Sequence, residues 1–200
     1  EHDIVSPGTG VAIVTEGGNQ NAKTIEYAGN SEAFIAWADF REGANADIYG
    51  QRLNASMEAL FQENGIPIAS TEEQELKPRA TFVENTTPFI AWKKGDEDSR
   101  VFYQFIDENG TVFSDDRTIS DNQALQTAPR VKRSATGEVF VNWKDLRDDP
   151  IDGDQYFQKI NTTGDKQWGD GVRLDPVDDV DFSARFSADS NGDLNILWAV

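Results

Sequence analysis

Two acidic loops carry the residue types and spacing that could bind a hard cation. Segment 148–154 places four carboxylates within seven residues, and carboxylates that close repel one another unless the loop is extended or a cation lies between them. Segment 189–193 places oxygen ligands at alternate positions, as a calcium loop does, but lacks the downstream bidentate Glu of an EF-hand. An Asn-Gly hairpin turn explains this second loop equally well. The candidate Ca²⁺ ligands are Asp148, Asp149, Asp152, Asp154, Asp189, Asn191 and Asp193.

The overall charge argues against several function classes. The chain of 200 residues has 18 Lys and Arg against 36 Asp and Glu, which gives a net charge of −18. Nucleic-acid binding needs a basic face, and anionic membrane surfaces repel an acidic chain. No apolar run approaches the ~18 residues of a membrane span. With no Cys and only His2, a Cys nucleophile is excluded, and a Ser-His-Asp triad or a His-based metal site is disfavoured.

The strongest pattern is an internal repeat marked by tryptophan. Short apolar strands end at Trp37, Trp92, Trp143 and Trp198, with spacings of 55, 51 and 55 residues. Thirteen residues before these tryptophans stand Thr24, Arg79, Arg130 and Arg185. A second apolar strand follows each of the first three tryptophans and contains Gln51, Gln104 or Gln158. Self-similarity at this period indicates stacked copies of one supersecondary unit.

One period contains four short strands separated by Gly, Asn, Asp and Ser turns. Four strands in a unit of 51–55 residues predict a blade of a β-propeller. We therefore expect an all-β fold in one domain, with three full repeats (about 10–64, 65–116 and 117–170) and a partial fourth (171–200). Helix content should be minimal because no stretch has a useful helical period. A β-sandwich or a β-solenoid is the alternative.

Segment 10–14 matches the last strand of the repeat, which leaves two interpretations of ring closure. In one, residues 1–14 complete the fourth sheet and close a four-bladed ring. In the other, the chain is part of a larger propeller and stops within a blade. Since residue 1 is Glu rather than Met, we expect a processed chain or a fragment. An open edge at the Trp198 strand would allow self-assembly by strand addition.

Two repeats share a motif of the form Trp-x-Asp-x-Arg. It stands at 37–41, before Ile48-Tyr49-Gly50-Gln51, and at 143–147, before Gln155-Tyr156-Phe157-Gln158. This pattern, over about residues 10–200, resembles the blade repeats of large secreted and cell-surface proteins of bacteria and archaea. The second repeat departs from it, because it lacks both the Asp, which Lys94 replaces, and the Arg. The resemblance implies a propeller and an extracellular or cell-surface location, but no ligand, since propellers host unrelated functions.

Each repeated residue has a structural and a functional interpretation. The tryptophans could stack on sugars, but we expect them to fill the space between adjacent blades. Trp168, outside this series, is a better candidate for an exposed aromatic, although we expect it to pack over the edge of a blade. The glutamines could bind a ligand, but we expect structural hydrogen bonds. The repeated arginines could gather an anion near the axis, but we expect ion pairs with Asp39 and Asp145, so the Lys94 repeat should lack its pair.

One end of the sheets should be strongly negative. The loops between the second and third strands (38–47, 93–100, 144–154) and those between repeats (15–23, 69–77, 120–128, 175–183) should emerge there together. They carry Glu72, Glu73, Glu75, Asp96, Glu97, Asp98, Asp148, Asp149, Asp152, Asp154, Asp178, Asp179 and Asp181. Such a surface attracts Ca²⁺ and basic proteins. Alternatively, it only keeps the protein soluble.

No catalytic motif stands out among the 36 acidic residues. The chain has no sialidase-type Ser-x-Asp-x-Gly-x-Thr-Trp box, no Gly-rich phosphate loop and no Gly-x-Ser-x-Gly elbow. We therefore expect a non-catalytic extracellular or cell-surface module for adhesion or assembly, with a protein or glycan partner. The alternatives are a glycoside-active propeller enzyme that uses paired carboxylates, and a calcium-stabilised filament or surface-layer subunit.

Overall fold

The computed structural model describes residues 11–84, 86–113, 117–174 and 185–197, which form fourteen strands and no helix. Trp198 and the other residues outside these ranges, His2 among them, are not described. The alternation of apolar and polar residues favours strands, and Gly, Asn and Asp turns separate them. No helix among the described residues is long and apolar enough to cross a membrane.

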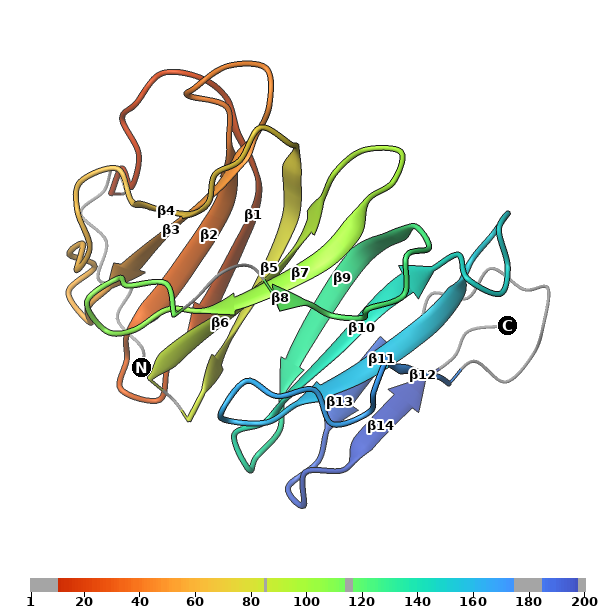
Figure 1. Ribbon diagram of the computed structural model, residues 1–200. Helices are drawn as coiled ribbons and strands as arrows, with labels where there is room; N and C mark the ends of the chain where they lie inside the picture. Colours follow the sequence, from red (N-terminus) through yellow and green to blue (C-terminus); the bar gives the residue numbers. More distant parts are fainter. Residues whose placement is uncertain (1–10, 85, 114–116, 175–184, 198–200) are drawn as a thin grey trace.

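Three sheets have four antiparallel strands each, joined in chain order (Figure 1). The first contains β1 (Gln20–Tyr27), β2 (Ala33–Asp39), β3 (Asp47–Leu53) and β4 (Ile66–Ala69). The second contains β5 (Glu75–Val83), β6 (Thr87–Lys94), β7 (Arg100–Phe105) and β8 (Arg117–Thr118). The third contains β9 (Gln126–Arg133), β10 (Val139–Asp145), β11 (Asp154–Ile160) and β12 (Val172–Arg173). A hairpin of β13 (Arg185–Ala188) and β14 (Leu194–Leu197) follows.

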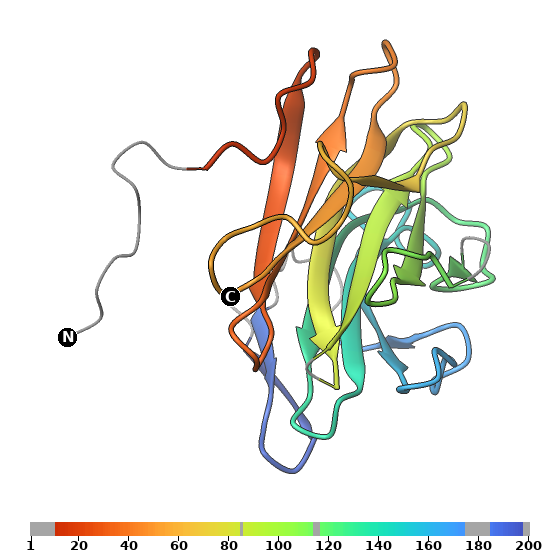
Figure 2. The ribbon, with the colours of Figure 1, turned by 90° about the vertical axis from the view of Figure 1, so that its left-hand side faces the viewer.

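The first strands of the sheets contact one another in sequence. β1 lies against β5, β5 against β9, and β9 against β13. Each of these strands is the edge strand of its own sheet, and we refer to the four as the inner strands. Figure 2, turned by 90°, shows the strands of successive sheets running along a common direction, so that their turns gather at two ends. The expected all-β fold of repeated four-stranded antiparallel units is confirmed.

The register repeats from sheet to sheet. Trp37 pairs with Tyr49, Trp92 with Phe102, and Trp143 with Tyr156. The pairing of each inner strand with the second strand is interrupted by a bulge, in β1 before Thr24, in β5 before Arg79 and opposite 142–144 in the third sheet. A repeated register with repeated irregularities shows that each sheet is a copy of one structural unit.

Two apolar clusters join the sheets. One lies between the first and second sheets and contains Phe34, Ile48, Phe82 and Trp92. The other lies between the second and third sheets and contains Phe89, Tyr103 and Trp143, among others. The rings of Phe157 and Phe186 meet edge-on at 5.5 Å and join the third sheet to the last hairpin. Trp92 and Trp143 therefore sit between sheets, where large apolar side chains bury the most surface. Trp37 is also buried, but it packs against Tyr49 of its own sheet.

The expectation of a strand at 10–14 is wrong for the residues described there. Residues 11–14 are not in a strand. A strand needs a partner to satisfy its backbone hydrogen bonds, and none of the described strands pairs with this segment. The segment leads instead into a loop whose Thr15 binds Asn64 of the first sheet.

Candidate functional site

The Trp-x-Asp-x-Arg motif forms one hydrogen-bonded unit at the end of β2. The indole Nε1 of Trp37 donates to Asp39 Oδ2 at 2.7 Å, and Nη2 of Arg41 donates to the same oxygen at 2.6 Å. The Arg41 guanidinium lies over the Tyr49 ring, 3.9 Å from its centroid, and also donates to the carbonyl of Asn64 at 3.0 Å. These contacts hold the Arg41 side chain in one orientation at the edge of the sheet.

The predicted partner of Asp39 and Asp145 is therefore wrong. We expected the inner-strand arginines, but Asp39 pairs with Arg41 and Asp145 pairs with Arg147 at 2.7 Å. The physical reason is that the two-residue period of a strand places Trp37 and Asp39 on one face. The chain turns after Asp39, so that both the N–H and the guanidinium of Arg41 meet the same carboxylate. The Asp can thus reach both the Trp before it and the Arg after it. Arg79 instead donates to the carbonyl of Pro78 at 2.8 Å.

The pKa values follow from these contacts. Burial alone would raise the pKa of Asp39, but hydrogen bonds from Arg41 and Trp37 together lower it below its ordinary value. The hydrogen bond to Asp39 raises the pKa of Arg41 in return. Burial raises the pKa of Tyr49. The three side chains therefore stay in fixed protonation states near neutral pH, and Arg41 presents a permanent positive charge.

A pocket of about 630 Å³ opens beside Arg41. Its walls come from three places: the segment before β1, the β2–β3 loop, and the first sheet from β3 to β4. The lining residues are Glu16, Gly17, Gly18, Arg41, Glu42, Tyr49, Gln62 and Pro67. Glu16 and Glu42 are exposed side chains from separate segments, so this pocket brings two carboxylates, a guanidinium and an amide to one place.

Local contacts fix the segment before β1 against the rest of the pocket. The backbone N–H of Thr15 donates to Asn64 Oδ1 at 2.8 Å, and Asn64 Nδ2 donates to Glu16 Oε1 at 3.3 Å. Gly18 has a φ of +90°, and a Cβ there would lie 3.0 Å from the Arg41 backbone. The close approach thus requires glycine.

The third sheet repeats this arrangement with a difference. Arg147 binds Asp145 and lies over the Tyr156 ring at 4.0 Å, and Nη2 of Arg147 also donates to the carbonyl of Asp170. The hydroxyl of Tyr156 donates to Asp148 in a short contact. Burial, together with the hydrogen bond to Asp148, raises the pKa of Tyr156. Asp148, which stands at the position of Glu42, is thus engaged with the tyrosine.

The second sheet has lost the motif, as the sequence indicates. Lys94 takes the place of the Asp, and its ammonium lies 3.6 Å from a Glu73 oxygen and 5.3 Å from the Phe102 ring centroid. Trp92 Nε1 is buried and has no hydrogen-bond partner among the described residues. The acidic pair at 39 and 47 in the first sheet is replaced here by the basic pair Lys94 and Arg100.

Two of the repeated glutamines, Gln51 and Gln158, hold the turn that follows their own strand. Gln51 Nε2 donates to the carbonyl of Gln62, and Gln51 Oε1 accepts from the N–H of Phe61. Gln158 makes the matching bonds to Gly169 and Trp168, and Gln104 Oε1 accepts from the N–H of Phe105. The Trp168 ring is half-buried and lies 5.8 Å from that of Phe140. The amides of Gln51 and Gln158 therefore position the loops that follow their strands.

Four of the candidate Ca²⁺ ligands, Asp148, Asp149, Asp154 and Asp189, have partners for their side chains within the protein. Asp149 accepts backbone N–H bonds from Ile151 and Asp152, while Asp154 is buried and pairs with Arg173 at 3.1 Å. Asp189 accepts from the N–H groups of Asn191 and Asp193, as in the alternative hairpin turn. Among the residues that the structure describes, no group of three or more His, Cys, Asp or Glu side chains could hold a metal ion.

The acidic end of the molecule is only partly as expected. Backbone hydrogen bonds join the β2–β3 and β6–β7 loops to the loop between the first two sheets, at Ala46–Glu75 and Gln74–Gly95. Asp96, Glu97 and Asp98 are exposed there. Glu75 and Asp154 are buried instead, where Thr71 donates to Glu75 and Arg173 pairs with Asp154. Asp178, Asp179 and Asp181 lie outside the described residues.

Comparisons with known proteins find a similar fold among solved structures. No protein-family model matches the sequence, and no curated protein matches it. An endo-arabinase from Bacteroides thetaiotaomicron is similar over 90% of this chain and 71% of its own, with a TM-score of 0.56 and 14% identity. An ulvan lyase, a polysaccharide lyase bound to GlcA(1-4)Rha3S, covers 84% of this chain with a TM-score of 0.53 and 7% identity.

A glycoside hydrolase described as putative, from Bacteroides ovatus, covers 76% of this chain with a TM-score of 0.50 and 9% identity. The chain spans about half the length of this hydrolase (49%) and of the lyase (47%). At these identities the likeness shows a shared all-β fold. The three solved structures are described as an endo-arabinase, a glycoside hydrolase and a polysaccharide lyase, which are classes of enzyme that cleave glycans.

Sequence reasoning missed the pocket beside Arg41. Glu42 stands three residues after Asp39, as Asp148 stands three residues after Asp145, and this spacing was a signal within the repeat. No comparable signal marks Glu16 or Gln62, because they reach the pocket only through the folding of the segment before β1 and of the β3–β4 loop.

Proposed function

We propose that this chain is a carbohydrate-binding β-propeller module of an extracellular or cell-surface protein. The sheets would be its blades, with the inner strands around the axis. The observation that carries the proposal is the pocket beside Arg41, where Glu16, Glu42 and Gln62 surround a fixed guanidinium. Carboxylates, amides and guanidinium groups are the hydrogen-bonding partners that sugar hydroxyls need, and a few such groups in a concave site set specificity. The fold shared with glycan-active proteins supports the same class of ligand.

Binding to neutral oligosaccharides tests this function. The intact chain is titrated by calorimetry with arabinan, xylan and mannan oligosaccharides. We expect one of these to bind, and Glu42→Gln to weaken it about tenfold, because a charged hydrogen bond contributes roughly 1.5–3 kcal/mol. Glu63→Gln is the matched control, since Glu63 is exposed on the neighbouring turn but does not line the pocket. No binding to any of them, or equal losses in both variants, contradicts the proposal.

A glycoside-active enzyme is the second candidate function. The observation in its favour is the presence of two carboxylates, Glu16 and Glu42, in one pocket. Glycoside hydrolysis uses such a pair, one as acid and the other as base or nucleophile. If the chain is an enzyme, incubation with the oligosaccharide that binds will release reducing ends. Glu16→Gln and Glu42→Gln will then each abolish turnover, whereas binding without turnover by the unmodified chain rejects catalysis.

A further inference from the structure

The inner strands are basic in a protein that is otherwise strongly acidic. They contain seven of the 18 Lys and Arg residues, at positions 23, 77, 79, 130, 132, 133 and 185, but only two of the 36 acids. One of the two acids, Glu75, is fully buried, and burial raises its pKa. The other, Glu26, is near Lys132 and Arg133. The chain has a net charge of −18, so this concentration of basic residues on the inner strands needs an explanation.

Three of these residues occupy the same place in successive units. Arg79 pairs with Ala91, Arg130 with Asn142, and Arg185 with Leu197, each opposite the residue just before a repeated Trp position. Their strands β5, β9 and β13 contact one another in that order. The arginines therefore form a row across three adjacent inner strands, which we call the arginine row. Thr24 takes this position in β1.

A repeated backbone irregularity precedes the arginines of β5 and β9. Lys77 and Ala128 have φ values of +56° and +53°, and each stands two residues before its arginine, beside the bulge. A left-handed conformation is costly for a residue other than glycine. A bulge re-aims the side chains that follow it and is common beside functional sites. Arg79 and Arg130 thus each follow a bulge that contains a strained, left-handed residue.

The charges in the row act on one another. Burial, followed by the charges of Arg185 and Arg79, lowers the pKa of Arg130. Burial, followed by Lys93 and Arg79, lowers the pKa of Lys77. Like charges held together destabilise the folded protein, and a bound anion offsets that repulsion. Arg79 and Arg130 are half-exposed and Arg185 is exposed, so solvent and ligands reach the row.

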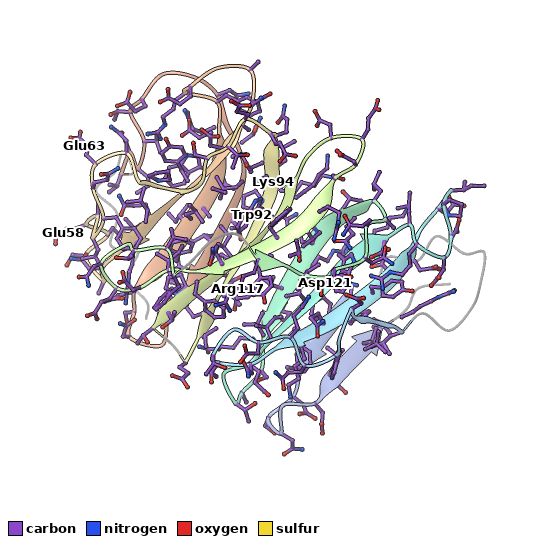
Figure 3. All side chains as sticks on the ribbon, viewed as in Figure 1. Glu58, Glu63, Trp92, Lys94, Arg117 and Asp121 are labelled. Atoms are coloured by element: carbon purple, nitrogen blue, oxygen red, sulfur yellow. The ribbon has the colours of Figure 1, made fainter. Side chains whose placement is uncertain are left out.

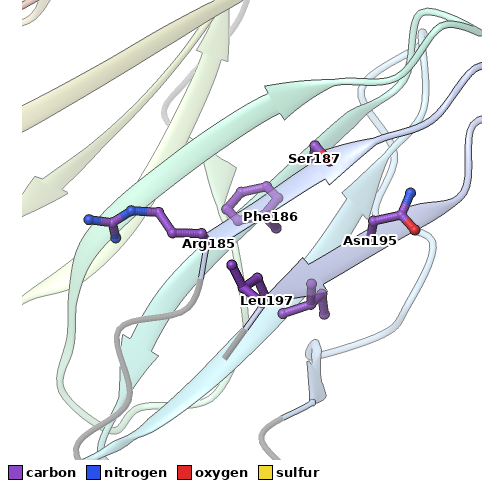
Figure 4. Close-up of a pocket in the computed structure, with 6 residues that line it drawn as sticks. Arg185, Phe186, Ser187, Asn195 and Leu197 are labelled. Atoms are coloured by element: carbon purple, nitrogen blue, oxygen red, sulfur yellow. The ribbon is translucent and has the colours of Figure 1, made fainter. Parts of the chain in front are cut away.

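A groove of about 350 Å³ lies beside the last arginine of the row (Figure 4). Arg185, Ser187, Asn195 and Leu197 are exposed at this groove, and Phe186 and Ile196 also line it. A guanidinium next to hydroxyl, amide and apolar groups suits a sugar ring that carries an anionic substituent. Figure 4 shows the guanidinium of Arg185 extending away from Leu197.

We propose that the arginine row binds the carboxylate or sulfate groups of an acidic polysaccharide, with one sugar seated in the groove beside Arg185. Arginine is suited to this task because its planar donors match carboxylate and sulfate oxygens in pairs. A polymer with repeated anionic groups contacts several arginines at once, which a single inorganic anion does not. This site goes beyond the neutral-sugar pocket beside Arg41 and is built from different residues.

The experiment compares polymers of different charge on the intact chain. Affinity is measured by calorimetry for polygalacturonate, a sulfated polysaccharide, neutral dextran and inorganic sulfate, at 20 and 200 mM NaCl. We expect an acidic polymer to bind at least tenfold more tightly than dextran and than inorganic sulfate, and to weaken with salt. Acidic polymers that bind no better than dextran overturn the proposal. If inorganic sulfate binds as tightly as the polymers, the assignment of the arginine row to a polysaccharide is overturned.

Variants separate the row from the overall charge of the chain. Arg185→Gln, at an exposed position, should weaken acidic-polymer binding about tenfold, and the triple change at Arg79, Arg130 and Arg185 should abolish it. The matched control replaces Lys144, Lys159 and Lys166 with Gln, which removes the same charge outside the inner strands. Equal losses in the two triple variants overturn the proposal. Neutral-oligosaccharide binding and its loss in Glu42→Gln report separately on the pocket beside Arg41.

Discussion

The buried indole N–H of Trp92 has no acceptor among the described residues, because Lys94 stands where the flanking sheets carry an Asp (Figure 3). In those sheets, the indoles of Trp37 and Trp143 donate to Asp39 and Asp145 at 2.7 and 2.8 Å. A buried donor without an acceptor costs about 1–3 kcal/mol. The second sheet thus lacks a stabilising hydrogen bond that the flanking sheets have. It also carries positive rather than negative charge at the end of its second strand.

Restoring the motif in the second sheet should stabilise the protein. We predict that the double change Lys94→Asp and Asp96→Arg raises the free energy of unfolding by about 1 kcal/mol, since the new carboxylate accepts from Trp92 and pairs with the new Arg. Lys94→Asp alone should stabilise less, because its carboxylate lies near Glu73 and has no Arg two residues after it, as Asp39 and Asp145 have. Urea unfolding of the three proteins measures both effects. A double variant no more stable than the single one contradicts this explanation.

Removing the carboxylate from an intact motif should destabilise the folded protein. We predict that Asp39→Ala lowers the free energy of unfolding by about 3 kcal/mol, because it leaves Arg41 and the Trp37 indole without their buried partner. Urea unfolding at pH 7 measures the loss. Asp145→Ala should show a similar loss, since Asp145 makes the same contacts in the third sheet. The exposed Glu63→Ala is the control, and a loss as small as the control's would show that the motif contributes little to stability.

The lowered pKa of Asp39 also predicts a pH dependence. A carboxyl whose pKa is lower in the folded state than its unfolded value near 3.8 contributes stability above that value, and the contribution is lost as the pH falls through the folded pKa. The stability difference between the unmodified chain and Asp39→Asn should therefore be constant from pH 5 to 7 and shrink below about pH 4. Thermal unfolding across this range measures it, and a constant difference down to pH 2 contradicts the assignment.

Glu75 should show the opposite dependence. Burial raises its pKa above the ordinary 4.5, and its Oε2 is buried without a partner among the described residues. The protonated form is therefore favoured in the folded state, and its stabilising contribution is complete at low pH and lost as the pH rises through the folded pKa. We predict that Glu75→Gln raises the Tm at pH 8 but not at pH 4. Glu72→Gln, at an exposed neighbour, should change neither, and a Glu75→Gln gain that is equal at both pH values refutes the assignment.

Glycines that approach the repeated tryptophans should not tolerate substitution. A Cβ at Gly65 would lie 2.5 Å from Trp37 Cη2, and one at Gly171 would lie 2.4 Å from Trp143 Cη2. Both residues also have positive φ, at +82° and +93°. We predict that Gly65→Ala and Gly171→Ala each cost more than about 2 kcal/mol. Gly17→Ala, where nothing lies within 4 Å, is the control, and urea unfolding that ranks all three alike would contradict this packing.

The sequence by itself determined the repeat and much of the local structure. Apolar and polar alternation, turn residues and the recurring tryptophans predicted most strands and their order, because these signals act over a few neighbouring residues. Part of the pairing within Trp-x-Asp-x-Arg was also available from sequence, since a strand places Trp37 and Asp39 on one face and Arg41 follows only two residues later. The recurrence of an arginine thirteen residues before each of three tryptophans favours a distant partner instead, although the nearer arginine is the one that pairs.

Only the tertiary structure decided how distant segments meet. Glu16 and Glu42 share a pocket because the segment before β1 folds back onto Asn64. Glu75 is predicted to be exposed because it stands in an acidic loop sequence, but the structure buries it. The arginine row exists because inner strands from three repeats contact one another. The physical reason is the range of the forces: local preferences shape each sheet, while packing between sheets sets which side chains from separate repeats come together.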